Sequence, residues 1–178
     1  MKFRRYVLIG FITFICFASL LLFFSSFYSL TISNTDSMYA YIFITLKKSK
    51  IVKDGYAVAF RMPSKQVFKW KKYYVLSHLD YYKGETFLKY VGCKSGEILN
   101  TVGRSDYCNG KFLTSVPKYL FLIPKPHVKI KDFPVWHDYR IPAGYFFAVC
   151  PNKYGLDSRY FGLVKDDRVL YNIIPLRL

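Results

Sequence analysis

Three short stretches of the sequence hold side chains that could carry out covalent chemistry together. Ser37 stands in NTDSM, Lys89 in FLKYVG, and Asp157 with Arg159 in GLDSRYFG. A serine hydroxyl becomes a nucleophile when a base removes its proton, and a neutral lysine can be that base. The three histidines sit in aromatic or proline-rich surroundings without a Ser-His-Asp signature, and we interpret them as surface or loop residues.

Lys89 is a candidate base because of its neighbours. In an extended strand alternate side chains share a face, so Lys89 lies on one face with Phe87 and Val91. If that face is buried, desolvation lowers the pKa of the lysine and leaves a neutral amine that can accept a proton. The alternative is a strand lysine whose stem is buried while its ammonium reaches water.

Asp157 and Arg159 flank Ser158, so alternation places them on one face, where they can form a charge-assisted pair. The alternative interpretation is a structural salt bridge at the beginning of a strand.

The four cysteines predict one disulfide. Cys93 and Cys108 are separated by a passage of strands and turns that could bring them together, which leaves Cys150 over. Cys16 lies in an apolar run. No Cys/His cluster has zinc spacing, so we expect no zinc site.

Most of the chain that would position these residues reads as short β-strands separated by turn signals, among them Asn109-Gly110, a strong hairpin signal. After residue 30 a helix is predicted only over 65–82, and the proline-rich stretch 112–140 is expected to be irregular. The expected strands cover 54–62, 86–93, 97–102, 105–113, 143–150 and 167–176.

Residues 6–30 carry no charge and are long enough to cross a bilayer as a helix. Lys2, Arg4 and Arg5 precede this run, and the positive-inside rule places the first five residues in the cytoplasm. Residues 31–178 would then form one extracytoplasmic domain. The alternative is a cleaved signal peptide, whose apolar core is usually shorter and ends in small residues.

The chain has 178 residues and a net charge of +16, with only three of its Lys and Arg residues before residue 31. Such a charge attracts nucleic acid or anionic lipid. Because the basic residues are scattered, with short clusters only at 47–50 and 69–72, we expect a solvated lysine surface beside an anionic membrane and no nucleic-acid partner.

Taken in order, an N-terminal apolar span, NTDSM, FLKYVGCKSGE and GLDSRYFG resemble the S26 signal peptidases, and most of all the TraF-type conjugal transfer peptidases. The expected fold is mainly β, with antiparallel sheets in a coiled, partly barrel-like arrangement and one N-terminal transmembrane helix. The resemblance implies cleavage of membrane-bound precursors after small residues, without metal or nucleotide.

The resemblance also implies roles for the residues at the expected reaction centre. Ser37 would be the nucleophile, and Lys89 the general base that takes its proton. The hydroxyl of Thr35 would join the backbone N–H of Ser37 in an oxyanion hole, a feature that contributes roughly 10²–10³ in rate per donor. The family's proline shortly after Ser-Met is absent, because Tyr39, Ala40 and Tyr41 follow here.

The resemblance assigns supporting roles as well. Asp157 and Arg159 would hold the lysine strand and the floor of the active site, and Gly92 and Gly96 would serve the turn after that strand. In the family a hydroxyl residue often stands two before the Asp and hydrogen-bonds the lysine. Here that position is Gly155, so another group or a water must orient Lys89.

The sequence thus predicts a membrane-anchored serine endopeptidase of a bacterial inner membrane, with its N-terminus cytoplasmic and its catalytic domain periplasmic. Its expected partners are the lipid bilayer and a membrane-bound precursor, such as a pilin of a conjugative or type IV secretion system. Water would release a hydrolysed product, whereas the substrate's own amine would give a cyclic one. The alternatives are a general signal peptidase I and a non-catalytic assembly subunit.

Overall fold

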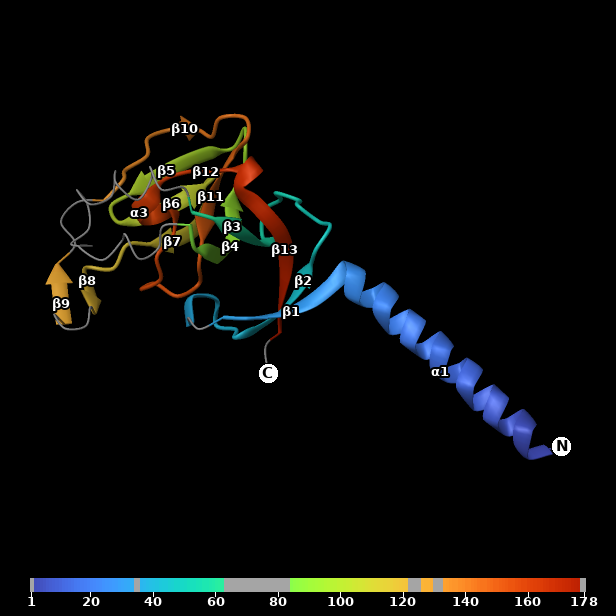
Figure 1. Ribbon diagram of the computed structural model, residues 1–178. Helices are drawn as coiled ribbons and strands as arrows, with labels where there is room; N and C mark the ends of the chain where they lie inside the picture. Colours follow the sequence, from blue (N-terminus) through green and yellow to red (C-terminus); the bar gives the residue numbers. More distant parts are fainter. Residues whose placement is uncertain (1, 34–35, 63–83, 122–125, 130–132, 177–178) are drawn as a thin grey trace.

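The computed structural model describes residues 2–33, 36–62, 84–121, 126–129 and 133–176. It begins with one long helix, α1 (Lys2–Phe27), which projects from a β domain (Figure 1). The segment Ile9–Phe27 is long and apolar enough to cross a membrane, and none of it is buried against the rest of the chain. The helix is therefore compatible with a membrane anchor.

The largest sheet has seven strands in the order β1-β2-β13-β3-β4-β11-β12, and its neighbouring strands are antiparallel. The sheet curves across the domain (Figure 1). The expected fold, mainly β with antiparallel strands, is therefore confirmed. The strands are β1 (Tyr28–Ile32), β2 (Ile42–Leu46), β3 (Ala57–Arg61), β4 (Thr86–Cys93), β11 (Tyr145–Val149), β12 (Val164–Lys165) and β13 (Val169–Leu176).

A second, four-stranded sheet has the order β10-β5-β6-β7, and β8 pairs with β9 in a separate hairpin. The turn between β6 and β7 is the predicted Asn109-Gly110, and both residues have positive φ (48° and 78°) as a two-residue hairpin turn requires. These strands are β5 (Ile98–Val102), β6 (Ser105–Cys108), β7 (Lys111–Ser115), β8 (Tyr119–Phe121), β9 (Pro126–Lys129) and β10 (Tyr139–Arg140).

The structure differs from the sequence predictions in several places. The expected span 6–30 stops being helical at Phe27, and β1 continues the chain as the edge strand that pairs with β2. Residues 112–140 are not wholly irregular, because they include the β8–β9 hairpin and β10. Asp157 does not begin a strand but caps the short helix α3 (Ser158–Phe161). The helix predicted over 65–82 lies outside the described residues.

Strand β4 separates two apolar clusters, because its alternate side chains point to opposite faces. Phe87 and Val91 belong to one cluster, in which the rings of Phe60, Phe146 and Phe161 pack edge to face. Leu88 belongs to the cluster on the other face. Lys89 therefore stands on the face that the phenylalanine-rich cluster covers.

The end of α1 is fastened to the β domain. The backbone N–H of Lys47 donates to the Phe27 carbonyl (2.9 Å), and Lys47 Nζ donates to the Ser25 carbonyl (2.7 Å). Lys48 Nζ lies 4.1 Å from the centre of the Phe27 ring. Carbonyls in the last turn of a helix lack partners within the helix, and here the turn after β2 (Ile42–Leu46) supplies them.

Candidate active site

Ser37 lies on a single 3-10 turn, η1 (Asp36–Met38), that packs against β4 (Thr86–Cys93). The base of this loop is closed by a hydrogen bond from the Ser33 N–H to the Tyr41 carbonyl (2.8 Å). Met38 is buried in the apolar cluster beside Leu88, while Ser37 itself stays half-buried and accessible. The turn therefore presents a serine at the surface next to the lysine strand.

Thr35, the expected second oxyanion donor, lies outside the described residues. Tyr39, which comes two residues after Ser37, has a φ of +51°, an uncommon conformation for a non-glycine residue. Such backbone geometry persists only where the surroundings fix it, and it is frequent beside functional groups.

Lys89 is buried, with only 3% of its surface exposed. Burial lowers the pKa of its amine below the usual 10.5; nearby Arg159 also lowers it, whereas charges on Cys150 and Asp157 act in the opposite direction. Lys89 takes part in none of the ion pairs that join described residues. A lysine in this setting can hold a neutral amine, which is the form that accepts a proton.

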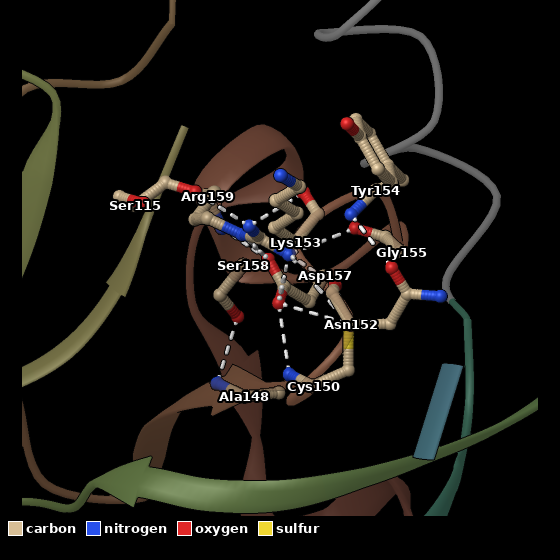
Figure 2. Close-up of polar contacts among 10 residues, drawn as sticks. All are labelled: Ser115, Ala148, Cys150, Asn152, Lys153, Tyr154, Gly155, Asp157, Ser158 and Arg159. Carbon is tan, nitrogen blue, oxygen red and sulfur yellow. Dashed lines mark hydrogen bonds and ion pairs between the residues drawn. The ribbon is translucent and has the colours of Figure 1, made fainter. Parts of the chain in front are cut away.

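Asp157 and Arg159 form the predicted pair, and both side chains are fully buried (Figure 2). Arg159 Nε donates to Asp157 Oδ1 (2.7 Å) and Nη2 donates to Oδ2 (2.8 Å), the bidentate geometry of a strong charge-assisted pair. Burial alone would lower the pKa of Arg159, but the Asp157 carboxylate outweighs that effect, so the net shift is upward. The guanidinium of Arg159 therefore stays protonated beside the buried Asp157 carboxylate.

Arg159 also organises the backbone around the pair. Its Nη1 donates to the Ser115 carbonyl of β7 (2.7 Å) and to the Lys153 carbonyl (2.9 Å), and its Nη2 donates to the Gly155 carbonyl (3.0 Å). Figure 2 shows the guanidinium enclosed by the loop that follows β11. One side chain thus ties that loop to the smaller sheet.

The loop 150–157 reaches the serine turn. The N–H of Asn152 points to the Ser37 carbonyl (3.4 Å), and a Cβ built on Gly155 would lie 3.4 Å from the Ser37 Cβ. The same Cβ would overlap the Cys150 Sγ. Glycine is therefore required at position 155 as long as Cys150 keeps its place.

The sequence suggested that Gly92 serves the turn after the lysine strand, but the structure does not place it in that turn. It lies inside β4 (Thr86–Cys93), and a Cβ there would come within 2.9 Å of the Val149 side chain on β11. Its role is the close approach of two strands. Gly96 does lie in the turn before β5, with a φ of +84°.

The disulfide joins Cys93 of β4 to Cys108 of β6, as predicted, with their Cα atoms 5.6 Å apart. Glu97 lies beside the two sulfurs, and the three residues have the composition of a metal site. Because both sulfurs are bonded to each other, they offer no thiolate to a metal.

The sequence did not assign a role to Cys150, a buried thiol between β11 and α3, or to the Asn152 N–H. From the sequence, Cys150 was only the cysteine left over from the predicted disulfide. Compared with known families, residues 3–173 match the family model described as signal peptidase, peptidase S26. No curated protein matches the chain.

Proposed function

The chain belongs to the S26 family of signal peptidases, and from that premise we propose a membrane-anchored endopeptidase that uses Ser37 as nucleophile and Lys89 as general base. The family membership makes the chain a serine peptidase of the signal peptidase I type. The observation that carries the residue assignment is that Lys89, on the strand against which the Ser37 turn packs, is buried and has no ion-pair partner among the described residues.

The chemistry follows from these two groups. The neutral Lys89 amine takes the proton from Ser37 Oγ as the oxygen attacks the scissile carbonyl carbon. The ammonium so formed returns the proton to the leaving amine when the peptide C–N bond breaks, and an ester remains on Ser37. The Ser37 N–H and the Thr35 hydroxyl are the proposed donors to the oxyanion.

The substrate is proposed to bind as an extended strand. β11 pairs with β4 only from Tyr90 onward, so among the described strands residues 86–89 have a partner on one side only, namely β3. An extended peptide can add to such an edge through backbone hydrogen bonds, while shallow pockets select small side chains.

A cavity of about 510 Å³ lies beside the next part of the same strand, from Tyr90 to Gly92, and we propose that it takes the chain beyond the scissile bond. Its wall includes Tyr90 and Gly92 of β4, Val149 of β11, and Cys150 in the loop that contacts the Ser37 turn. Polypeptide leaving the reaction centre on this side would run between β4 and the β6–β7 hairpin.

The bilayer is the proposed second partner. Leu30 and Ile32 of β1 are 70% and 74% exposed, and they follow directly on the apolar helix. Tyr39 and Tyr41, on the loop that carries Ser37, are also exposed. A surface of this kind next to a span is suited to the headgroup region, where a precursor's own membrane segment would present its cleavage site.

We assign the precursor, more narrowly, to pilin-type proteins of a conjugative or type IV secretion system, on the TraF-like motifs of the sequence. The acyl-enzyme would pass either to water or to the substrate's own N-terminal amine. Co-expression with candidate precursors and intact-mass analysis separates the outcomes. A product lighter by one water than the linear mature chain means cyclisation, and cleavage of ordinary secreted preproteins instead means a general signal peptidase.

The catalytic assignment is tested with purified full-length protein in detergent and a precursor peptide with small residues before the scissile bond. Ser37→Ala and Lys89→Ala are each expected to abolish cleavage. The controls are Ser33→Ala, a serine before the η1 turn, and Lys94→Ala, a lysine directly after β4. Both variants should cleave at a rate close to that of the unmodified protein. Cleavage at the normal rate by either Ser37→Ala or Lys89→Ala rules out the assignment.

A further inference from the structure

Cys150 is a buried thiol in contact with several parts of the site. Its Sγ lies 3.3 Å from Asp157 Oδ2 and 3.3 Å from the Asn152 carbonyl oxygen, both of which can accept the S–H. Its backbone N–H donates to the same Asp157 oxygen (2.9 Å). Figure 2 shows the sulfur beneath the carboxylate, at the base of the loop.

The sulfur occupies a specific volume beside the nucleophile. A Cβ on Gly155 would overlap Cys150 Sγ and would lie 3.4 Å from the Ser37 Cβ. The space into which a side chain at position 155 would project, next to Ser37, is therefore already filled by the thiol. The side chains of residues 150 and 155 would compete for this one space, so only one of the two positions can fill it.

The Asp157 carboxylate has little capacity left for another donor. Its Oδ1 accepts from the backbone N–H and Nε of Arg159, and its Oδ2 accepts from Arg159 Nη2 and from the Cys150 N–H and S–H. A carboxylate offers roughly four lone-pair sites. The arrangement leaves no good acceptor position for the amine of Lys89.

We propose that Cys150 is a positioning residue for the Lys89 amine: its thiol fills the space beside Gly155 and caps the Asp157 carboxylate, so that Lys89 serves Ser37 instead of pairing with Asp157. This inference rests on the proposed function of Lys89 as the base.

The electrostatics are consistent with this role. Burial and the neighbouring Asp157 raise the pKa of Cys150 to about 12, so at neutral pH the group is an uncharged thiol that adds no negative charge beside Lys89. A thiolate at Cys150 would raise the pKa of Lys89, but while the thiol is protonated the charged groups that act on Lys89 are Asp157, which raises its pKa, and Arg159, which lowers it. Loss of the thiol would expose Asp157 Oδ2 to the amine and so raise the pKa of Lys89.

The first test is the pH dependence of kcat for Cys150→Ala and Cys150→Ser, measured with the precursor peptide. In Cys150→Ala we expect the rise of kcat with pH to move to higher pH by about one unit, which is about a tenfold loss at neutral pH, with KM unchanged. Cys150→Ser, whose hydroxyl can still donate to Asp157, should keep most of the activity and the original profile.

The second test exchanges the two positions. Gly155→Ser alone should lose activity, because its Cβ overlaps the sulfur. The double variant Cys150→Ala with Gly155→Ser moves a hydroxyl into the vacated space and should be more active than either single variant. Independent substitutions would instead multiply their losses, so a double variant at that product contradicts the proposal.

Lys89→Ala separates this inference from the function on which it rests. If Lys89→Ala is inactive while Cys150→Ala keeps the normal rate and pH profile, the role of Cys150 is wrong and the proposed function stands. If Lys89→Ala is active, both fall. Thermal unfolding followed by circular dichroism identifies a variant that fails to fold, and for such a case Cys150→Ser and the double variant still decide.

Discussion

At the residue scale, Arg159 connects several parts of the candidate site through its hydrogen bonds. It neutralises Asp157 and binds carbonyls of β7 and of the loop that carries Cys150 and Gly155. A buried ion pair is not by itself strong evidence of stability, but removal of one partner leaves an uncompensated buried charge.

Arg159→Ala is expected to lower the free energy of unfolding by about 3–5 kcal/mol, because Asp157 would remain buried without its cation. Arg168→Ala is the matched control: its pair with Asp167 is exposed (46% and 73%) and should matter by about 1 kcal/mol or less. Urea unfolding of the full-length variants measures both. Equal effects of the two substitutions would contradict the structural role of Arg159.

Lys89 should reduce stability at neutral pH while it enables catalysis. Because the folded-state pKa is below 10.5, the unfolded chain binds more protons between these two values, and stability rises with pH across that window. Lys89→Met removes the buried amine, so we expect an inactive protein with a higher Tm at neutral pH. The gain should shrink as the pH approaches 10.5.

Tm measured against pH checks this prediction, with Lys94→Met as a control for the loss of one exposed positive charge. A lower Tm for Lys89→Met at neutral pH would mean that the amine stabilises the fold. The lowered pKa of Lys89 also predicts that the rate of cleavage rises with pH, because Lys89 must lose its proton to act as a base. A rate that is still near its maximum at pH 5 would contradict a lysine base.

Some residues of the candidate site were proposed from the sequence, whereas Cys150 and Asn152 were not. Strand alternation singled out Lys89 and the Asp157–Arg159 pair, and Ser37 was proposed from the motif NTDSM and its resemblance to a known family. The place of Cys150 depends on a contact across a loop with a glycine that has no side chain. Local alternation carries no information about such a contact.

At the element scale, β4 (Thr86–Cys93) has the same bounds in sequence prediction and structure, because its alternation, β-branched residues and flanking turns agree. β1 (Tyr28–Ile32) was missed, because its composition continues that of the apolar helix and only its pairing with β2 makes it a strand. α3 was missed because four residues are too few for helical periodicity to be seen.

The disulfide links the seven-stranded sheet to the four-stranded sheet, and its loss should lower the stability of the domain. Cys93 and Cys108 are 15 residues apart, so reduction or replacement of both by Ser should lower the free energy of unfolding by about 3 kcal/mol. Cys16→Ser, which removes a free cysteine on α1, is the control. A urea midpoint that is unchanged after reduction of the unmodified protein would contradict this contribution.

At the scale of the whole molecule, an apolar helix leads into an exposed edge strand of the β domain that belongs to the signal peptidase family. The helix ends at the Lys47 and Lys48 contacts and passes straight into β1, so the span and the sheet edge form one continuous structure (Figure 1). The Ser37 loop follows that edge. This continuity would keep the proposed nucleophile close to the surface of a membrane that α1 spans.

The proposed orientation, with Lys2, Arg4 and Arg5 in the cytoplasm, follows the positive-inside rule. A reporter that is active only outside the cytoplasm should be active when fused to the C-terminus. Replacement of the three basic residues by Ser should lower the fraction of chains with that orientation. Activity of a strictly cytoplasmic reporter at the C-terminus would contradict the topology.

The central claim, that Ser37 is a nucleophile activated by Lys89, is tested most directly by trapping the covalent intermediate. Rapid acid quench during turnover of the precursor peptide, followed by proteolysis and mass analysis, should find an ester on the peptide that contains Ser37. The ester should be absent from Ser37→Ala and form far more slowly in Lys89→Ala. An ester on another residue, or full-rate acylation without Lys89, would contradict the account.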